Sequence, residues 1–165
     1  MTASQRLSLP FIAPGQAQKE LLHNEALQAL DIIVAAAVEE PPAASPPQSP
    51  AAGACYIVAP GATGIWDGRD HQIAAFTLAG WRYISPAEGM TALVRSTGTT
   101  AMFVGGSWHL GEIRGAKLVI GGDQVVGARS AAIASPNGGT TIDSEARSAI
   151  SSILQALRQH GLIAQ

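Results

Sequence analysis

Short β-rich runs separated by glycine and proline turn signals fill residues 53–128, and this pattern constrains the fold most strongly. Each run has four to eight residues, a length typical of strands rather than of helices. The runs lie at 53–60, 72–77, 81–85, 91–95, 100–104, 107–113, 117–120 and 124–127. Strands this short and this regularly spaced favour an antiparallel meander. The last two runs are joined by Gly-Gly-Asp, which is a strong hairpin signal.

A weak internal repeat lies within these runs. Ala-Ala-Phe at 74–76 is followed by Trp81, and Ala-Met-Phe at 101–103 is followed by Trp108, an offset of 27 residues. A tight turn separates Phe from Trp in each copy, so we expect the two aromatic rings to pair across a hairpin. Two copies are too few for a propeller or a solenoid. The repeat therefore predicts a duplicated hairpin.

Both ends of the chain carry helix signals with wide apolar stripes. Good helix formers dominate from Gln16 onward, and a second helix is predicted from a cap at Asp143 or Ser144 to about His160, with Gly161 as its left-handed end. Such stripes need a groove or copies of the same helix as partners. The predicted anchor and oligomer interface consists of Leu22, Leu27, Leu30, Val34, Ile150, Ile153 and Leu157. The polar residues 23–25 interrupt the first stripe. They could fix the register of an oligomer at a packing position, or they could form a face of the helix that contacts water.

A proline-rich segment at 39–53 separates the first helix from the strands. Five prolines between 41 and 50 favour extended polyproline II, a semi-rigid spacer of about 30 Å at ~3.1 Å per residue. We therefore expect an N-terminal anchoring helix (1–38), a linker (39–53), an antiparallel β module (54–134) and a C-terminal loop and helix (135–165). The predicted fold class is mainly β with flanking α-helices.

Charged residues are scarce in this chain. Asp, Glu, Lys and Arg make up 13% of it, against about 25% in ordinary soluble domains. We therefore expect other subunits to cover much of the surface, in a homo-oligomer with closed cyclic symmetry. The net charge of −2 and the lack of a basic run argue against nucleic acid and anionic membranes as partners. No export signal and no apolar run of membrane-spanning length are found, so we expect synthesis in the cytoplasm.

Three tryptophans are the best candidates for ligand contact. Trp66, Trp81 and Trp108 could stack on sugar rings, with Asp67 and Asp70 binding the hydroxyl groups. The alternative is that these tryptophans form the core of a small sheet, which is the commoner role of large aromatic side chains.

The sequence gives little support to catalysis or metal binding. A glycoside hydrolase would need Asp67 or Asp70 at about 5–10 Å from a second carboxylate such as Glu88 or Glu112. The four histidines are scattered and far in sequence from Cys55, so no zinc site is predicted. Ser107 is not in a G-x-S-x-G motif, and no triad with His109 is expected. We predict no enzyme activity, no cofactor and no metal.

Three blocks of the sequence, at 9–31, 64–89 and 125–163, together resemble an uncharacterised-domain family. Its members are encoded in the structural gene clusters of phages, prophages and gene transfer agents of alphaproteobacteria. The resemblance implies a structural virion protein of the head-spike, fibre or tail-fibre type, without enzymatic activity. Spikes and fibres are most often trimers, so the expected homo-oligomer is a trimer.

The same resemblance implies a location and partners. The protein would be assembled into virions in the bacterial cytoplasm and released by lysis. It would serve as an anchor or adapter in host-surface attachment, in contact with capsid, portal, tail or distal-fibre proteins. Host-surface polysaccharide is a further candidate partner. The alternatives are a carbohydrate-binding receptor module and, less favoured, a capsule-degrading glycoside hydrolase.

Overall fold

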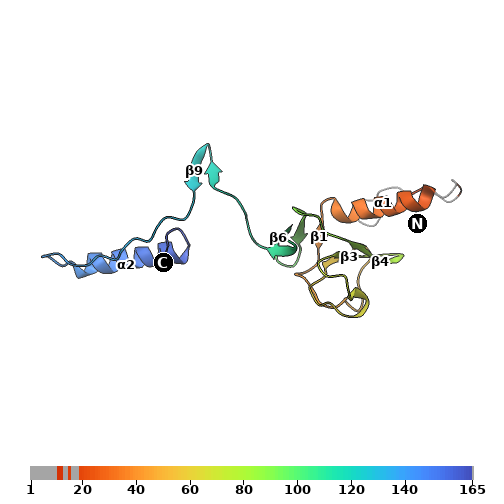
Figure 1. The fold of residues 1–165 in the computed structure, drawn as a ribbon, viewed down its shortest axis with the longest axis horizontal. Helices are drawn as coiled ribbons and strands as arrows, with labels where there is room; N and C mark the ends of the chain where they lie inside the picture. Colours follow the sequence, from red (N-terminus) through yellow and green to blue (C-terminus); the bar gives the residue numbers. More distant parts are fainter. Residues whose placement is uncertain (1–10, 13–14, 16–18, 165) are drawn as a thin grey trace. The chain divides into compact units, whose positions relative to one another are not determined.

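The computed structural model describes residues 11–12, 15 and 19–164 of the chain. It is mainly β, with one helix near each end, which confirms the predicted fold class (Figure 1). The chain divides after Glu112 into two units, and each is described separately below. Neither helix of the described residues combines the length and apolarity needed to cross a membrane.

The first helix, α1 (Lys19–Ile33), is part of the first unit. Ile32 near its end is 1% exposed and packs in a core cluster with Val38. The chain then turns at Ala35 into β1 (Ala37–Val38), which pairs in parallel with β5 (Thr91–Val94). The helix is therefore fixed to the sheets through its C-terminal turn, and it does not stand apart from them.

Two antiparallel meanders form the body of this unit. The first contains β2 (Cys55–Ile57), β3 (Ile73–Thr77) and β4 (Gly80–Ile84), with the short 3-10 helix η1 (Gly64–Trp66) between β2 and β3. The second contains β5, β6 (Thr99–Val104) and β7 (Ser107–Leu110), and β1 adds a fourth strand to it.

The duplicated hairpin is confirmed by the strand register. Phe76 lies directly opposite Trp81 in β3–β4, and Phe103 lies directly opposite Trp108 in β6–β7. The ring centroids are 5.1 Å apart in the first pair and 5.4 Å in the second, both in edge-to-face contact. In the second hairpin Gly105 and Gly106 supply the two positive φ angles that a tight turn of this kind requires.

Strands β2 and β3 are covered on both faces, whereas β4 at the edge of the sheet is half-buried. Alternate residues of β2 point to opposite sides, so Cys55 and Ile57 enter a cluster with Ile32 and Val94, whereas Tyr56 enters a second cluster. That second cluster also holds Val58, Ala74 and Trp66. A strand that is covered on both sides has apolar residues at consecutive positions, which explains the sequence Cys-Tyr-Ile-Val at 55–58.

The proline-rich segment differs from the expected spacer. The backbone of Ala43 donates to Ile57 O at 3.0 Å and accepts from Ala59 N at 2.8 Å, and Ala44 O accepts from Thr63 N at 2.8 Å. The non-proline residues between the prolines keep their N–H and C=O groups and use them on the chain that follows β2. The segment therefore belongs to the first unit. This unit includes residues before position 54 and ends at Glu112, whereas the predicted β module spans 54–134.

The second unit holds the hairpin of β8 (Leu118–Ile120) and β9 (Asp123–Val126) and the helix α2 (Ser144–Gln159). Asp143 Oδ1 caps α2 by accepting from Ala146 N at 2.8 Å, and Gly161 ends the helix with φ +71°. Both helix ends were predicted correctly. The extended chain at Ser130 pairs with the backbone of Leu162 and Ala164 after the helix.

Candidate functional site

The tryptophans Trp66 and Trp81 lie in an aromatic cluster of the first unit. Their ring centroids are 5.3 Å apart, and Tyr56 lies 5.9 Å from Trp66 and 6.0 Å from Trp81. Trp66 is completely buried, so its ring has no free face for a sugar. Trp81 is half-buried beside Phe76. For Trp66 the structure shows the core role rather than a stacking platform.

Trp108 lies in a different environment from the other two tryptophans. It packs against the core cluster shared by the two sheets, and its Nε1 donates to the carbonyl of His71 at 2.8 Å. His71 has φ +65°, a strained conformation for a residue that is not glycine. Trp108 and His71 line a cavity of about 140 Å³ with Pro42, Ile57, Val58, Pro60 and Ser107. The three tryptophans therefore do not form one binding platform.

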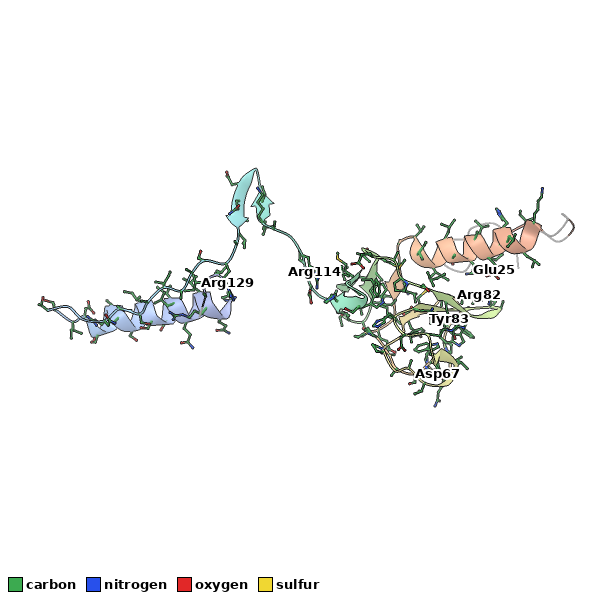
Figure 2. The ribbon with its side chains drawn as sticks, in the orientation of Figure 1. Glu25, Asp67, Arg82, Tyr83, Arg114 and Arg129 are labelled. Atoms are coloured by element: carbon green, nitrogen blue, oxygen red, sulfur yellow. The ribbon has the colours of Figure 1, made fainter. Side chains whose placement is uncertain are left out.

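The two predicted aspartates have different positions in the loop between β2 and β3. Asp70 Oδ1 accepts from Gly61 N at 3.1 Å and so closes the loop on itself. Asp67 is exposed just after η1, and Figure 2 shows it at the edge of the unit. Asp70 therefore has a structural contact, and Asp67 has an accessible carboxylate.

Tyr83 of β4 holds the same loop from the other side. Its hydroxyl donates to Ile65 O at 3.0 Å, and the guanidinium of Arg69 lies 4.6 Å from the centre of its ring. Burial raises the pKa of Tyr83 above its ordinary value, although the nearby Arg69 acts in the opposite direction. Sequence reasoning missed this contact because no local pattern links residues 18 positions apart.

Ser107, His109 and Glu112 form a hydrogen-bond chain that the sequence reasoning did not expect. Ser107 Oγ lies 3.2 Å from His109 Nε2, and His109 Nδ1 lies 3.3 Å from Glu112 Oε1. This order of contacts is that of a serine hydrolase triad. However, Gly105 N in the adjoining turn donates to the Glu88 carboxylate at 2.7 Å. That N–H is therefore already bonded to a carboxylate and is not a free donor for an oxyanion.

The predicted interface residues of the two helices are largely accessible. On α1, Leu22 is 80% exposed, Val34 just beyond it is 50% and Leu30 is 44%. On α2, Ile153 is 59% and Ile150 is 44% exposed. Leu27 and Leu157 are half-buried within the chain.

The polar residues that interrupt α1 have contacts inside the first unit. Asn24 Oδ1 accepts from Ile12 N at 3.0 Å, and Glu25 forms an ion pair with Arg82 of β4 at 3.1 Å. Figure 2 labels both members of this pair, one on α1 and one on β4. Glu25 therefore orients the helix on the sheet.

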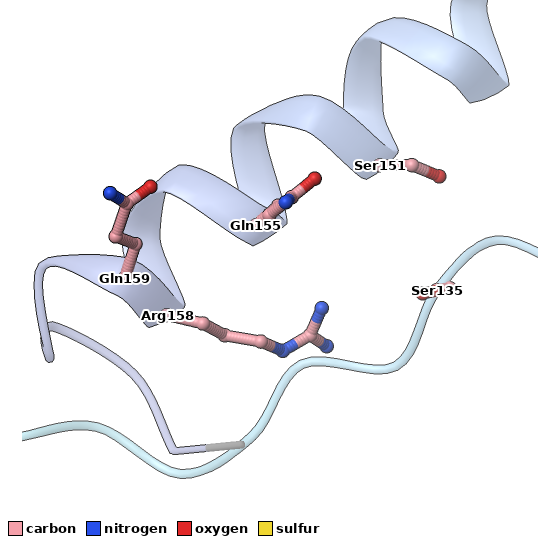
Figure 3. A pocket seen from close by; sticks show the side chains of 5 residues that line it. All are labelled: Ser135, Ser151, Gln155, Arg158 and Gln159. Carbon is pink, nitrogen blue, oxygen red and sulfur yellow. The ribbon is translucent and has the colours of Figure 1, made fainter.

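A shallow hollow on the second unit lies between α2 and the extended chain (Figure 3). It is lined by Ser135, Ser151, Gln155, Arg158 and Gln159. Arg158 reaches across it and donates to Ile133 O at 2.6 Å. Its guanidinium thus has a structural use, holding the extended chain against the helix. No group of three metal-ligating side chains occurs in the part of the chain that the structure describes.

The fold defines a small β protein with an N-terminal helix docked on its sheets. A family described as "Protein of unknown function (DUF2793)" matches residues 23–109, more than half of the chain. The chain belongs to this family. The matched range begins inside α1 and ends in β7, so it lies wholly within the first unit and covers none of the second. The comparison with curated proteins gives no match.

Proposed function

We propose that the protein is a structural virion component of a phage or gene transfer agent, a head spike, fibre or tail-fibre protein. It acts without catalysis, as an anchor or adapter in host-surface attachment, and functions as a homo-oligomer, with three copies favoured. Its partners are other virion proteins. The location and the class of particle come from the resemblance of the sequence to phage structural proteins.

The observation that carries this proposal is the apolar surface of α1. The helix packs on the sheets through Ile32 near its C-terminal end, and the exposed ion pair Glu25–Arg82 links it to β4. Leu22 and Leu30 nevertheless remain exposed. Rigid helices with exposed apolar side chains are surfaces for another protein, because water contact with that area is unfavourable. In an anchor, this face would dock on the particle.

The alternative, carbohydrate recognition, has to rest on Trp108 and the cavity it shares with His71, since Trp66 is enclosed. A capsule-degrading hydrolase would rest on the accessible Asp67. Neither arrangement combines an exposed aromatic face with converging polar groups, and we therefore favour the structural role.

Particle association tests the proposal through the double variant Leu22→Lys/Leu30→Lys. Both side chains are exposed, so lysine is tolerated within the chain itself, but two charges would have to be desolvated at a particle interface. We expect the variant to be lost from sedimented particles by at least tenfold. The matched control is Ile65→Lys/Leu78→Lys, which adds the same charge at exposed positions elsewhere in the first unit.

Deletion of the N-terminal helix is a poor substitute for these substitutions. It would remove Ile32 and, if extended to residue 40, Val38, both of which lie in the core.

Equal retention of both double variants on particles would contradict the anchoring role of α1.

A further inference from the structure

The second unit has almost no core of its own. Of the described residues 113–164, only Leu154 and Ile163 are buried. Large apolar side chains between 43% and 102% exposed occur on the hairpin, the extended chain and α2. They are Ile113, Leu118, Val119, Ile120, Val125, Val126, Ile133, Ile142, Ile150, Ile153 and Leu162. Two buried side chains, at about 1.5–3 kcal/mol each, cannot offset an ordering cost of roughly 1–2 kcal/mol per residue.

The lack of buried apolar side chains is clearest in the hairpin β8–β9. Every residue of both strands is exposed, and apolar side chains occupy both faces, so neither face is reserved for water. Within the described part of the chain no further strand joins this two-stranded sheet, so both outer edges are open to pairing with another chain. An isolated two-stranded hairpin is marginally stable in water.

We propose that residues 113–165 are a self-association unit, in which hairpin β8–β9 and the exposed face of α2 form their core against the same surfaces of further copies of this chain. This inference deepens the proposed function, since it names the partner that the second unit takes. It rests on the burial pattern of this unit and not on the particle.

The hairpin and α2 expose a large part of the apolar area that a contact between copies needs. At roughly 60–120 Å² per fully exposed aliphatic side chain, their seven exposed apolar side chains leave about 200–400 Å² of apolar surface per copy. A standard interface buries about 800 Å² per partner, of which somewhat more than half is apolar. Most of the apolar part of one such interface is therefore available on these two elements.

The charge of the hairpin favours an identical partner. Lys117 precedes β8 and Asp123 begins β9 at the opposite end, so the hairpin carries opposite charges that balance. Two hairpins that meet in opposite directions therefore bring Lys117 of one copy toward Asp123 of the other. Copies related by a rotation axis bury the same residues in every chain and close the assembly without another gene product.

The test uses the purified full chain and the double variant Ile120→Lys/Val125→Lys. These side chains are 62% and 52% exposed, so the lysines meet water in a single chain and are desolvated only between copies. Native mass spectrometry and sedimentation velocity should give a multiple of the chain mass for the wild type. We expect the variant to fall to the mass of one chain. The control Ile65→Lys/Leu78→Lys should keep the multiple.

A second readout separates loss of assembly from misfolding. All three tryptophans lie in the first unit, so an unchanged tryptophan melting curve shows that this unit is still folded. Hydrogen exchange at the amides of β8 and β9 should be slow in the assembly and accelerate at least tenfold in the variant.

A wild-type chain that stays at the mass of one copy at all concentrations would overturn the proposal. So would a variant that keeps the wild-type mass. Neither result depends on particles, whereas a wild-type oligomer that is intact but absent from particles would count against the proposed function alone.

Discussion

The indole of Trp66 has no solvent-exposed surface and packs against the rings of Tyr56 and Trp81. Among the described residues its Nε1 has no hydrogen-bond partner, whereas its ring contacts two other aromatic rings. A buried tryptophan of this kind stabilises the first unit and presents nothing to a ligand.

Trp66→Ala should therefore destabilise the first unit by about 3–5 kcal/mol, the usual cost of removing a large aromatic side chain from a core. Thermal and urea unfolding, followed by the fluorescence of Trp81 and Trp108, measure this change. The neighbouring Ile65→Ala is the control: Ile65 is 59% exposed, so an effect within about 0.5 kcal/mol is expected. A Trp66→Ala protein as stable as the wild type would contradict the role of Trp66 in the core of the first unit.

The raised pKa values of the two tyrosines predict that the folded protein loses stability at alkaline pH. Burial raises the pKa of Tyr56, with Glu39 and Glu40 adding to the effect, and burial likewise raises the pKa of Tyr83. Unfolded tyrosines ionise near pH 10, before the folded ones. The folded state therefore loses stability as the pH rises through 10 and through the raised pKa values.

Tyrosinate absorbance should show both groups titrating at higher pH in the folded protein than in denaturant, and the melting temperature should fall over the same range. Because the chain has only these two tyrosines, the titration reports on them alone. Identical titration curves in the folded and the denatured protein would contradict the burial of both rings.

At the level of elements, α1 combines a buried and an exposed side. Ile32 is 1% exposed within the core, whereas Leu22 is 80% exposed. Ile32→Ala should cost about 2–5 kcal/mol of unfolding free energy, while Leu22→Ala should change it by less than about 0.5 kcal/mol. Denaturant unfolding of the two variants gives the comparison. Equal effects would mean that the helix does not dock on the sheets as described.

The hairpins were predictable from sequence because a two-residue turn fixes the register and so places each Phe opposite its Trp. The docking of α1 was not predictable, since the pair Glu25–Arg82 joins residues 57 positions apart. The path of the proline-rich segment depends on Ala43 meeting the chain near Ile57, a non-local contact that local composition does not encode. For that reason the segment predicted as a spacer is instead hydrogen-bonded within the first unit.

At the scale of the whole molecule, the two units differ in how they bury apolar surface. The first unit encloses two core clusters and includes the whole range matched by the DUF2793 family. The second exposes nearly all its aliphatic side chains. Low charge content, visible in composition, predicts a surface partly covered by other subunits. Composition does not indicate which unit exposes the apolar side chains, because exposure follows from tertiary packing.

The central claim, that this chain is a virion component, is tested most directly by quantifying it in purified particles from a host that carries its gene. Mass spectrometry of gradient-purified particles, with an affinity label imaged on intact ones, is the measurement. We predict a fixed number of copies per particle, a multiple of three, at one defined position on the surface. Absence of the chain from particles, with all of it recovered in the soluble lysate, would contradict the account.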